Sequence, residues 1–275
     1  MYLPAFCKAA REYEKFALPQ AKVSCFLAEN VLLNLDLEPV HSLWDIGCGT
    51  ALASKAILRL LAERGHSYPC QRVLVDREPE MLDVAARNLL EFDELSANVI
   101  LANAFEFEWV VTCQRNNQLL GRKIVISTYL LQWSDNPLDI ILGPWLELLS
   151  TGDTLAVAFP DNRSFKLFQL SLEKVNLEER FFSMHHSDVL LGPKAQDQLS
   201  QYYELISFGK SDDSVSVNQP LDYLKHFSKI GANSLVPRFT NKEIKRIIGG
   251  LYETLEDGHP CRLDYFSTWM ILKRL

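Results

Sequence analysis

The chain has 275 residues, of which 48% are hydrophobic, and its mean hydropathy is −0.04. That length suits one large domain with a substantial insertion, and no apolar run reaches the ~18 residues of a membrane helix. The net charge of −7 argues against a protein that binds nucleic acid by neutralising phosphates. Residues 1–10 lack the basic and apolar regions of a signal peptide, so we expect a cytoplasmic protein without a membrane segment.

The six cysteines stand at positions 7, 25, 48, 70, 113 and 261, and no two have C-x-x-C spacing. Scattered cysteines in a chain of this length are usually buried apolar residues in a reducing compartment. A structural zinc site needs about four close ligands, and the pair His185-His186 has no companions in the sequence. We therefore expect no metal site.

At the N-terminus, apolar residues at helical spacing over about 5–35 predict one or two helices. Strand and helix patterns then alternate. Strands are predicted at 42–46, 72–75, 98–101, 123–127 and 154–159, with helices at 51–63, 79–91 and 137–149. This alternation is typical of crossover units, which form a parallel sheet with helices on both faces.

After Pro160 the alternation lapses. Residues 161 to about 205 are predicted to be a helical insertion over the carboxyl edge of the sheet. A strand at 214–217, helices at 221–229 and 241–255, and a last strand at 262–272 complete the pattern, with the late strands antiparallel at the sheet edge. We therefore predict an α/β protein with a single domain over 1–275.

The strongest motif is the strand-to-loop passage Asp45 to Thr50, DIGCGT. Its glycines allow a tight turn and a close approach of a nucleotide-type ligand, and the next helix offers its N-terminal N–H groups. An ordinary strand-to-helix turn would also explain two glycines. Asp76 adds weight to a ligand site, because a carboxylate at the end of the second strand can accept hydrogen bonds from both ribose hydroxyls.

A dinucleotide-binding enzyme is the main competing interpretation. Such enzymes normally have a third glycine for the pyrophosphate, but Ala51 and Leu52 follow Thr50 here. Asp76 also lies further from the loop than the usual ~20 residues, as if the polar stretch 64–71 were a lengthened loop. A ligand without a pyrophosphate, S-adenosylmethionine, therefore fits better than NAD.

These residues resemble the motifs of class I S-adenosylmethionine-dependent methyltransferases. Residues 45–51 resemble the first motif, and Asp76 resembles the ribose-binding acid, followed by Met81 in a Pro-x-Met-Leu context. Residues 101–105 resemble the adenine loop, with Asn103 where many members have Asp. The resemblance implies a Rossmann-like fold with a mostly parallel seven-stranded sheet, and S-adenosylmethionine as the cofactor.

Segments 5–20, 127–133, 224–234 and 263–266 further resemble the malonyl-acyl-carrier-protein O-methyltransferases of biotin synthesis, whereas 106–121 and 161–205 match poorly. This family implies methylation of the free carboxylate of a malonyl thioester held on acyl carrier protein, with residues 1–38 as a helical lid. Two alternatives remain: a methyltransferase for another small-molecule carboxylate or nucleophile, and a non-catalytic module that binds the cofactor or the carrier protein.

The resemblance also implies roles for individual residues. Tyr13 and Trp133 would be catalytic, although each is also compatible with an ordinary packed aromatic. Gln132 and Arg238 would contact the substrate. The expected cofactor contacts are Gln20, Asp45, Gly47, Gly49, Asp76, Arg77, Met81, Asn103, Ala104, Phe105, Ser127 and Thr128.

The charge distribution suggests where a carrier protein would bind. Residues 221–248 carry a net charge of +4, so the rest of the chain carries −11. This segment is either a solvated helical face or a docking patch for an acidic partner, and acyl carrier proteins are acidic. The candidate docking residues are Lys225, Lys229, Lys242, Lys245 and Arg246.

The implied chemistry needs few protein groups. A malonyl carboxylate is already ionised at pH 7, because carboxyl pKa values lie near 4, and it needs no general base. The protein must align the carboxylate oxygen, methyl carbon and sulfur and exclude water, and such orientation can be worth roughly 7 to 11 kcal/mol. The sequence shows no Ser-His-Asp or paired-carboxylate arrangement, which agrees with this chemistry but does not identify the substrate.

Overall fold

The computed structural model describes residues 10, 12–34, 40–92, 96–115, 121–180, 186–230 and 239–275. Within these ranges, a seven-stranded sheet has the order β3-β2-β1-β4-β5-β9-β6. Strands β1 to β5 are parallel, whereas β9 runs antiparallel to both β5 and β6. The prediction of a parallel sheet, with the strands near the end of the chain antiparallel at its edge, is confirmed. The strands are β1 (Ser42–Ile46), β2 (Gln71–Asp76), β3 (Asn98–Leu101), β4 (Lys123–Thr128), β5 (Thr154–Pro160), β6 (Tyr203–Asp212) and β9 (Phe266–Arg274).

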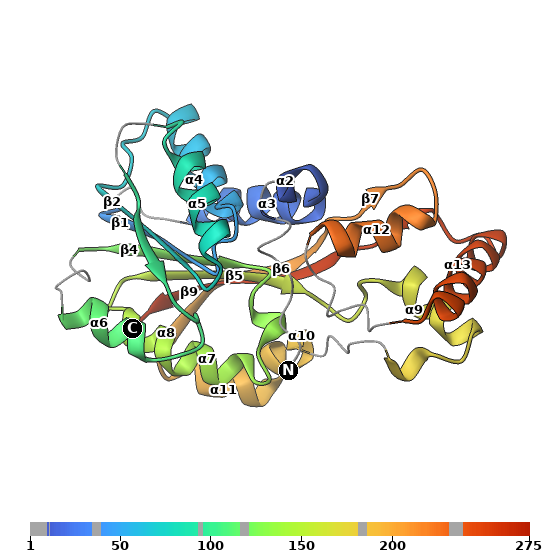
Figure 1. The fold of residues 1–275 in the computed structure, drawn as a ribbon. Coiled ribbons are helices and arrows are strands. Elements are labelled where there is room, and N and C mark those ends of the chain that lie inside the picture. The colour runs from blue at the N-terminus through green and yellow to red at the C-terminus, as the bar shows by residue number, and fades with distance from the viewer. Residues whose placement is uncertain are drawn as a thin grey trace.

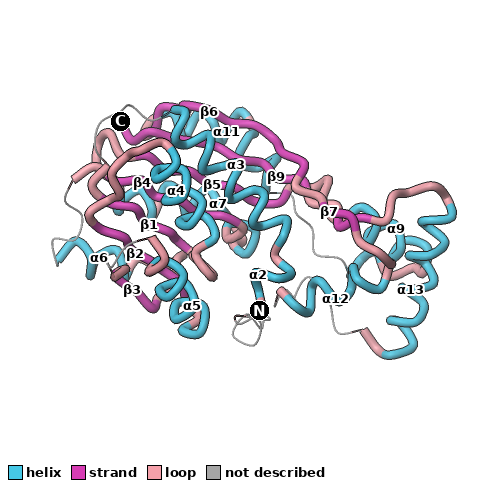
Figure 2. Tube along the Cα trace, turned by 90° about the horizontal axis from the view of Figure 1, so that it is seen from above, coloured by secondary structure: helices cyan, strands magenta, loops and turns pink. Residues whose placement is uncertain are grey.

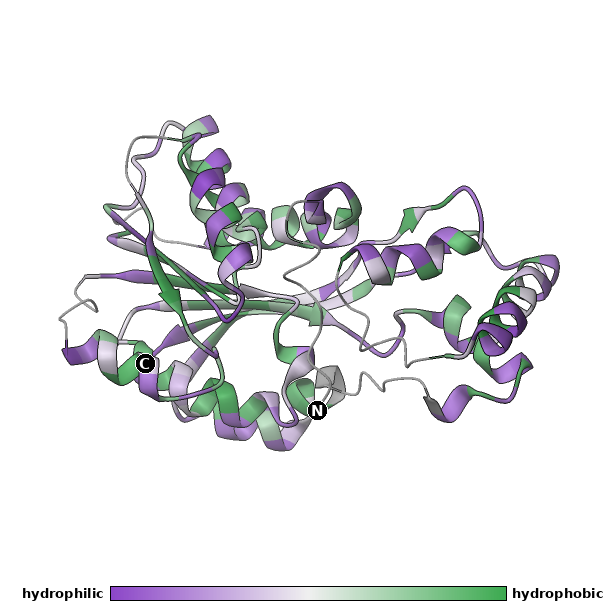
Figure 3. Cartoon of the chain, viewed as in Figure 1, coloured by the Kyte–Doolittle hydropathy of each residue, from purple (hydrophilic) through white to green (hydrophobic). Residues whose placement is uncertain are grey.

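Helices cover both faces of the sheet (Figure 1). Buried strands divide their side chains between two apolar cores: Leu43 belongs to the core beneath the first helix layer, and its neighbour Trp44 to the core beneath the second. Hydrophobic residues accordingly gather between the layers (Figure 3). The first layer comprises α3 (Leu18–Asn34), α4 (Leu52–Glu63) and α5 (Pro79–Leu89); the second comprises α6 (Glu108–Arg115), α7 (Pro137–Leu142), α8 (Pro144–Leu148), α10 (His186–Leu191) and α11 (Pro193–Ser200).

A third apolar core lies beyond the carboxyl ends of β5 and β6 and belongs to a unit that we call the cap, residues 161–180 with the described part of 215–265. Buried aromatic rings dominate it, with Phe168 stacked on Tyr223 at a centroid distance of 6.0 Å. The short helix α2 (Tyr13–Phe16) lies between the cap and the rest of the molecule (Figure 2). The cap contains α9 (Lys166–Lys174), η2 (Glu178–Arg180), β7 (Val215–Ser216), α12 (Leu221–Lys229), α13 (Asn241–Glu256) and β8 (Arg262–Leu263).

The structure differs from the predicted elements in four places. The helix predicted at 137–149 is two helices, because Pro144 has no N–H to continue the first one and instead begins the second. Helix α6 was not predicted. Strand β6 occupies 203–212, where a helix was expected to continue to about 205. The strand predicted at 214–217 is shorter than expected and consists of β7 alone, Val215–Ser216. The last long strand begins at Phe266 rather than at 262.

The segment expected to form one helical insertion, about 161–205, is divided between two places in the fold. Its first part, with α9, packs in the cap, and its later part, with α10 and α11, joins the second helix layer. No helix among the described residues is long and apolar enough to cross a membrane. The same residues contain no group of three His, Cys, Asp or Glu side chains arranged to hold a metal ion.

Candidate functional site

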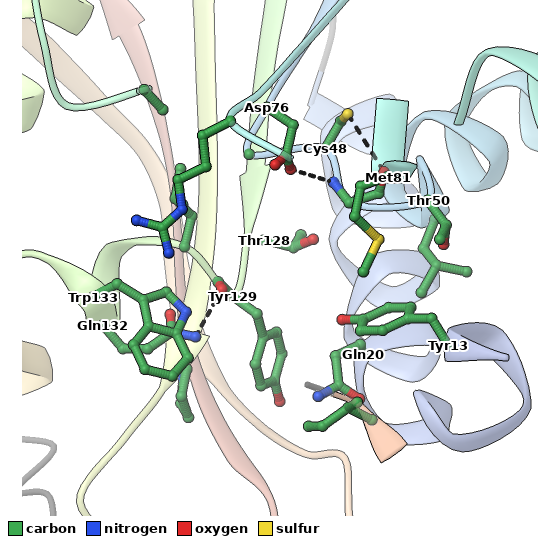
Figure 4. A pocket seen from close by; sticks show the side chains of 18 of the residues that line it. Tyr13, Gln20, Cys48, Thr50, Asp76, Met81, Thr128, Tyr129, Gln132 and Trp133 are labelled. Carbon is green, nitrogen blue, oxygen red and sulfur yellow. Dashed lines mark hydrogen bonds between the residues drawn. The ribbon is translucent and has the colours of Figure 1, made fainter. Parts of the chain in front are cut away.

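A pocket opens at the carboxyl ends of β1, β2 and β4, between the sheet and the cap. Figure 4 shows Asp76 and Met81 at one end of it, with Gln132 and Trp133 facing Tyr13 across the opening. Most of the residues predicted for the site line this pocket. They are Tyr13, Gln20, Gly47, Gly49, Asp76, Arg77, Met81, Asn103, Ala104, Phe105, Thr128, Gln132 and Trp133.

The loop after β1 has the left-handed backbone that its glycines permit. Gly47 has φ +66° and Gly49 has φ +54°. A Cβ atom at Gly47 would lie 2.5 Å from Leu130 Cδ2, whereas one at Gly49 would meet no protein atom within 4 Å. Gly49 therefore leaves open space in the pocket wall, as a closely approaching ligand requires.

Asp76 connects this loop to the end of β2. Its Oδ2 accepts a hydrogen bond from the Gly49 N–H at 2.9 Å, and its Oδ1 accepts one from the Glu78 N–H at 3.0 Å. Each carboxylate oxygen can accept another hydrogen bond, so Asp76 is able to receive two hydroxyl groups from a ligand. Burial raises the pKa of this carboxyl, and the backbone N–H donors act in the opposite direction.

Two predicted contact residues do not line the pocket. Asp45 is buried behind the loop, where its Oδ2 accepts hydrogen bonds from the Ser54 N–H at 3.1 Å and the Ser54 hydroxyl at 2.8 Å. Burial raises the pKa of Asp45 to about 7. The Ser127 hydroxyl donates to the Ile46 carbonyl at 2.7 Å. Both side chains therefore hold the loop and strand ends together rather than face a ligand.

The loop after β3 uses the Asn103 side chain within its own turn. Asn103 Oδ1 accepts from the Phe105 N–H at 3.3 Å, and Nδ2 donates to Glu106 at 2.8 Å. The Ala104 carbonyl accepts the buried indole N–H of Trp145 at 2.9 Å. The turn presents Asn103, Ala104 and Phe105 to the pocket without requiring the Asp found in many methyltransferases.

Helix α2 is fixed to the first helix layer through Glu14. This carboxylate contacts Lys55 at 3.3 Å and accepts a hydrogen bond from Asn88 at 2.7 Å. The arrangement places Tyr13 at the pocket wall. Burial, reinforced by the charge of Asp76, raises the pKa of Tyr13, so its hydroxyl stays protonated and can donate a hydrogen bond.

Three residues that line the pocket each have a buried side-chain oxygen with no hydrogen-bond partner among the described residues. These oxygens are Oε1 of Gln20, Oγ1 of Thr50 and Oε1 of Gln132. Gln132 is oriented by a hydrogen bond from its Nε2 to the Tyr129 carbonyl at 2.7 Å. Buried polar atoms are rarely left unsatisfied, so these oxygens fit a ligand that carries N–H or O–H donors, such as the amino-acid end and ribose of S-adenosylmethionine.

Several lining residues were missed by sequence reasoning. Cys48 lies inside the glycine motif, and Tyr129, with φ +55°, directly follows β4. The position of each in the sequence could therefore have identified it as a pocket residue. Leu52, Leu130, Pro160, Phe165, Ile230 and Tyr265 also line the pocket. The last three reach it from the cap, and no local motif marks them. The predicted substrate contact Arg238 lies outside the described residues.

Comparison with solved structures defines the class of fold. A Bacillus halodurans protein classed as a methyltransferase superposes with a TM-score of 0.55 at 14% identity, over 90% of this chain and 97% of the other. The YcgJ protein from Bacillus subtilis gives the same TM-score at 13% identity and the same coverage. Together with the strand order, these likenesses show the Rossmann-like fold of class I methyltransferases.

Among curated proteins, the chain is similar to the malonyl-[acyl-carrier protein] O-methyltransferase of Brevibacillus brevis, with 28% identity over 138 residues. The matched segment covers 50% of this chain and 45% of that protein. This relative belongs to the family whose motifs the sequence resembles. No protein-family profile matches the chain.

Proposed function

We propose that this chain is an S-adenosylmethionine-dependent methyltransferase that methylates the free carboxylate of a malonyl group carried on acyl carrier protein, an early step of biotin synthesis. The observation that carries the proposal is the pocket itself. A glycine loop with open space at Gly49, the carboxylate of Asp76 and three unsatisfied oxygens meet on a methyltransferase fold. The malonyl specificity is supported by the Brevibacillus brevis relative.

The residues present suit a cofactor bound along the carboxyl ends of β1 to β4. Asp76 would receive the ribose hydroxyls, the turn at 103–105 and Met81 would surround the adenine, and Gln20 would face the amino-acid end. When bound, S-adenosylmethionine supplies an electrophilic methyl carbon on its sulfonium. Thr128 and the glycine loop would line the pocket next to the bound cofactor.

The cap side of the pocket would receive the acyl group. Its described wall is mainly aromatic, with Tyr129, Trp133, Phe165 and Tyr265. Such a wall excludes water from the reacting carboxylate, so the anion loses hydration as it meets the positive charge of the cofactor. Tyr13, which keeps its proton, would donate a hydrogen bond that orients the carboxylate oxygen toward the methyl carbon.

The carrier protein would bind at the exposed face of α12 and α13. Lys242 and Lys245 are exposed on α13. Two other candidate cations already have acidic partners: Lys225 contacts Asp222 at 3.2 Å, and Lys229 contacts Glu12 at 3.0 Å. Arg246 donates to a backbone carbonyl at 2.6 Å. Lys242 and Lys245 are therefore the cations best suited to meet an acidic surface.

Mass spectrometry of malonyl-carrier protein tests this function directly. Incubation with the enzyme and S-adenosylmethionine should add the mass of one CH2 unit to the malonyl-carrier protein, and acetyl-carrier protein, which lacks the free carboxylate, should remain unchanged. Methylation of free small acids alone would favour a small-molecule methyltransferase. Binding of the cofactor without any methyl transfer would favour a non-catalytic module.

A further inference from the structure

Two aromatic residues at the pocket have a left-handed backbone, which bulky side chains rarely adopt. Among the described residues, four that are not glycine have this conformation: Ala51, Tyr129, Phe165 and Asn176. Tyr129 has φ +55° and Phe165 has φ +62°, and both line the pocket. A left-handed backbone costs free energy for a residue with a Cβ atom, and strain of this kind in bulky residues is typical of functional sites.

The Tyr129 residue is held at both of its ends. Its backbone N–H donates to the Ala158 carbonyl in β5 at 2.8 Å, which continues the pairing of β4 with β5. Its hydroxyl oxygen lies 2.9 Å from the hydroxyl oxygen of Ser267, a fully buried residue of β9. Two hydroxyl groups at this distance share one hydrogen bond. The ring is therefore fixed to two strands of the sheet.

Tyr129 is the first of three aromatic rings that continue into the cap. Its ring centroid lies 5.9 Å from that of Tyr265, which packs edge-on against Phe165 at 4.6 Å. All three residues line the pocket, and we call them the aromatic wall. Phe165 and Tyr265 are almost completely buried, whereas Tyr129 is partly exposed. Figure 4 shows the Tyr129 ring in the space between Trp133 and Tyr13, so Tyr129 offers a ligand the most surface of the three.

A wall that is fixed in this way limits the size of the group that the pocket accepts. Extra methylene groups in an acyl chain need space beside the reacting carboxylate, and a ring held by β5 and β9 cannot move aside to provide it. We propose that Tyr129 is a specificity-determining residue that restricts the acyl group to a short dicarboxylic one such as malonyl, with Ser267 as the positioning residue for its ring. This inference rests on the proposed function, in which the acyl group occupies the cap side of the pocket.

Glutaryl-carrier protein tests this limit, because its acyl group ends in the same carboxylate and is longer than malonyl by two methylene groups. We expect Tyr129→Gly to raise the ratio of kcat/KM for glutaryl- to that for malonyl-carrier protein at least about tenfold, the effect of methylene groups in an apolar pocket. Glycine removes the ring and adopts the left-handed backbone without strain. Calorimetric titration with S-adenosylhomocysteine checks that the variant keeps a folded cofactor site.

Tyr129→Phe and Ser267→Ala keep the ring and remove only the hydrogen bond between the two hydroxyl groups. Each should raise the same ratio about threefold, the effect of one neutral hydrogen bond. The double variant should exceed neither single one, because both remove the same contact. A general structural role would lower kcat/KM for both carrier proteins equally. Unchanged ratios in both variants would overturn the role of Ser267 and, if Tyr129→Gly does not fold, the whole proposal.

The matched controls are Asn176→Gly and Tyr203→Phe. Asn176 has φ +53° and is exposed on the cap, outside the pocket. Tyr203 donates its buried hydroxyl to the Ile141 carbonyl at 3.1 Å, also outside the pocket. Neither control should change the ratio. A Tyr129→Gly variant that binds S-adenosylhomocysteine and keeps the wild-type ratio would overturn the role of Tyr129. A wild-type protein that methylates neither carrier protein would instead contradict the proposed function, and with it this role.

Discussion

At the scale of single residues, the loop after β1 shows why a side chain at Gly47 should disturb the pocket. Gly47 and Gly65 have nearly the same left-handed backbone, with φ +66° and +69°. They differ in their surroundings, because a Cβ at Gly47 would overlap Leu130, which lines the pocket, and a Cβ at Gly65 would meet no atom within 4 Å. Conformational strain and steric overlap can therefore be measured separately.

We expect both Gly47→Ala and Gly65→Ala to lower the free energy of unfolding by about 1–2 kcal/mol, the cost of a left-handed alanine. Only Gly47→Ala should also weaken S-adenosylmethionine, by about tenfold or more, because Leu130 must move at the pocket wall. Denaturant unfolding and calorimetric titration measure the two effects. Equal cofactor affinities in the two variants would show that the Leu130 contact does not shape the site.

At the scale of elements, the cap depends on the close approach of α9 and α13. Gly250 is buried at this contact, and a Cβ there would lie 2.7 Å from the backbone oxygen of Ser171 in α9. Its neighbour Gly249 is exposed, with no atom within 4 Å of an added Cβ. Backbone cannot yield as a side chain can, so the methyl group at Gly250 must separate the helices.

We predict opposite effects for these neighbouring substitutions. Gly249→Ala should stabilise the protein by up to about 1 kcal/mol, because alanine favours the helical conformation. Gly250→Ala should destabilise it by about 1–3 kcal/mol, the usual cost of overpacking. Urea denaturation measures both. A stabilising Gly250→Ala would mean that α9 and α13 do not pack as closely as described.

The elements also show what the sequence can predict. The buried strands β1, β2, β4 and β5 were predicted within about a residue, because both faces of each are covered and the apolar run is continuous. The exposed edge strand β3 was also predicted, because three of its four residues are apolar. Strand β6, at the other edge, was missed because polar residues interrupt its apolar ones, so hydrophobicity does not mark it. The same limit applies to the site: the loop and Asp76 follow local motifs, whereas Phe165, Ile230 and Tyr265 enter the pocket only through the packing of the cap.

At the scale of the whole molecule, the pocket and the proposed docking surface belong to different parts of the structure. The cofactor end is built on the sheet, and the candidate docking cations lie on the cap, so charge reversal on α13 should affect the carrier protein alone. We expect Lys242→Glu with Lys245→Glu to raise KM for malonyl-carrier protein about tenfold, with kcat and cofactor affinity unchanged. The effect should shrink at high salt.

The control for this charge reversal is Lys194→Glu with Lys210→Glu, which changes two exposed lysines on α11 and β6. It changes net charge equally, so it corrects for long-range repulsion between the enzyme and its acidic partner. An equal rise in KM for both double variants would assign the effect to net charge and remove α13 as the docking surface.

The proposed function requires that the pocket at Asp76 is a cofactor site. Calorimetric titration of S-adenosylmethionine into the wild-type protein and into Asp76→Ala tests this most directly. We predict one molecule bound per chain with a micromolar Kd, and at least about a tenfold loss in Asp76→Ala, which removes the acceptor for the ribose hydroxyls. A wild-type protein that does not bind S-adenosylmethionine, or an Asp76→Ala variant that binds it equally well, would contradict the proposed function.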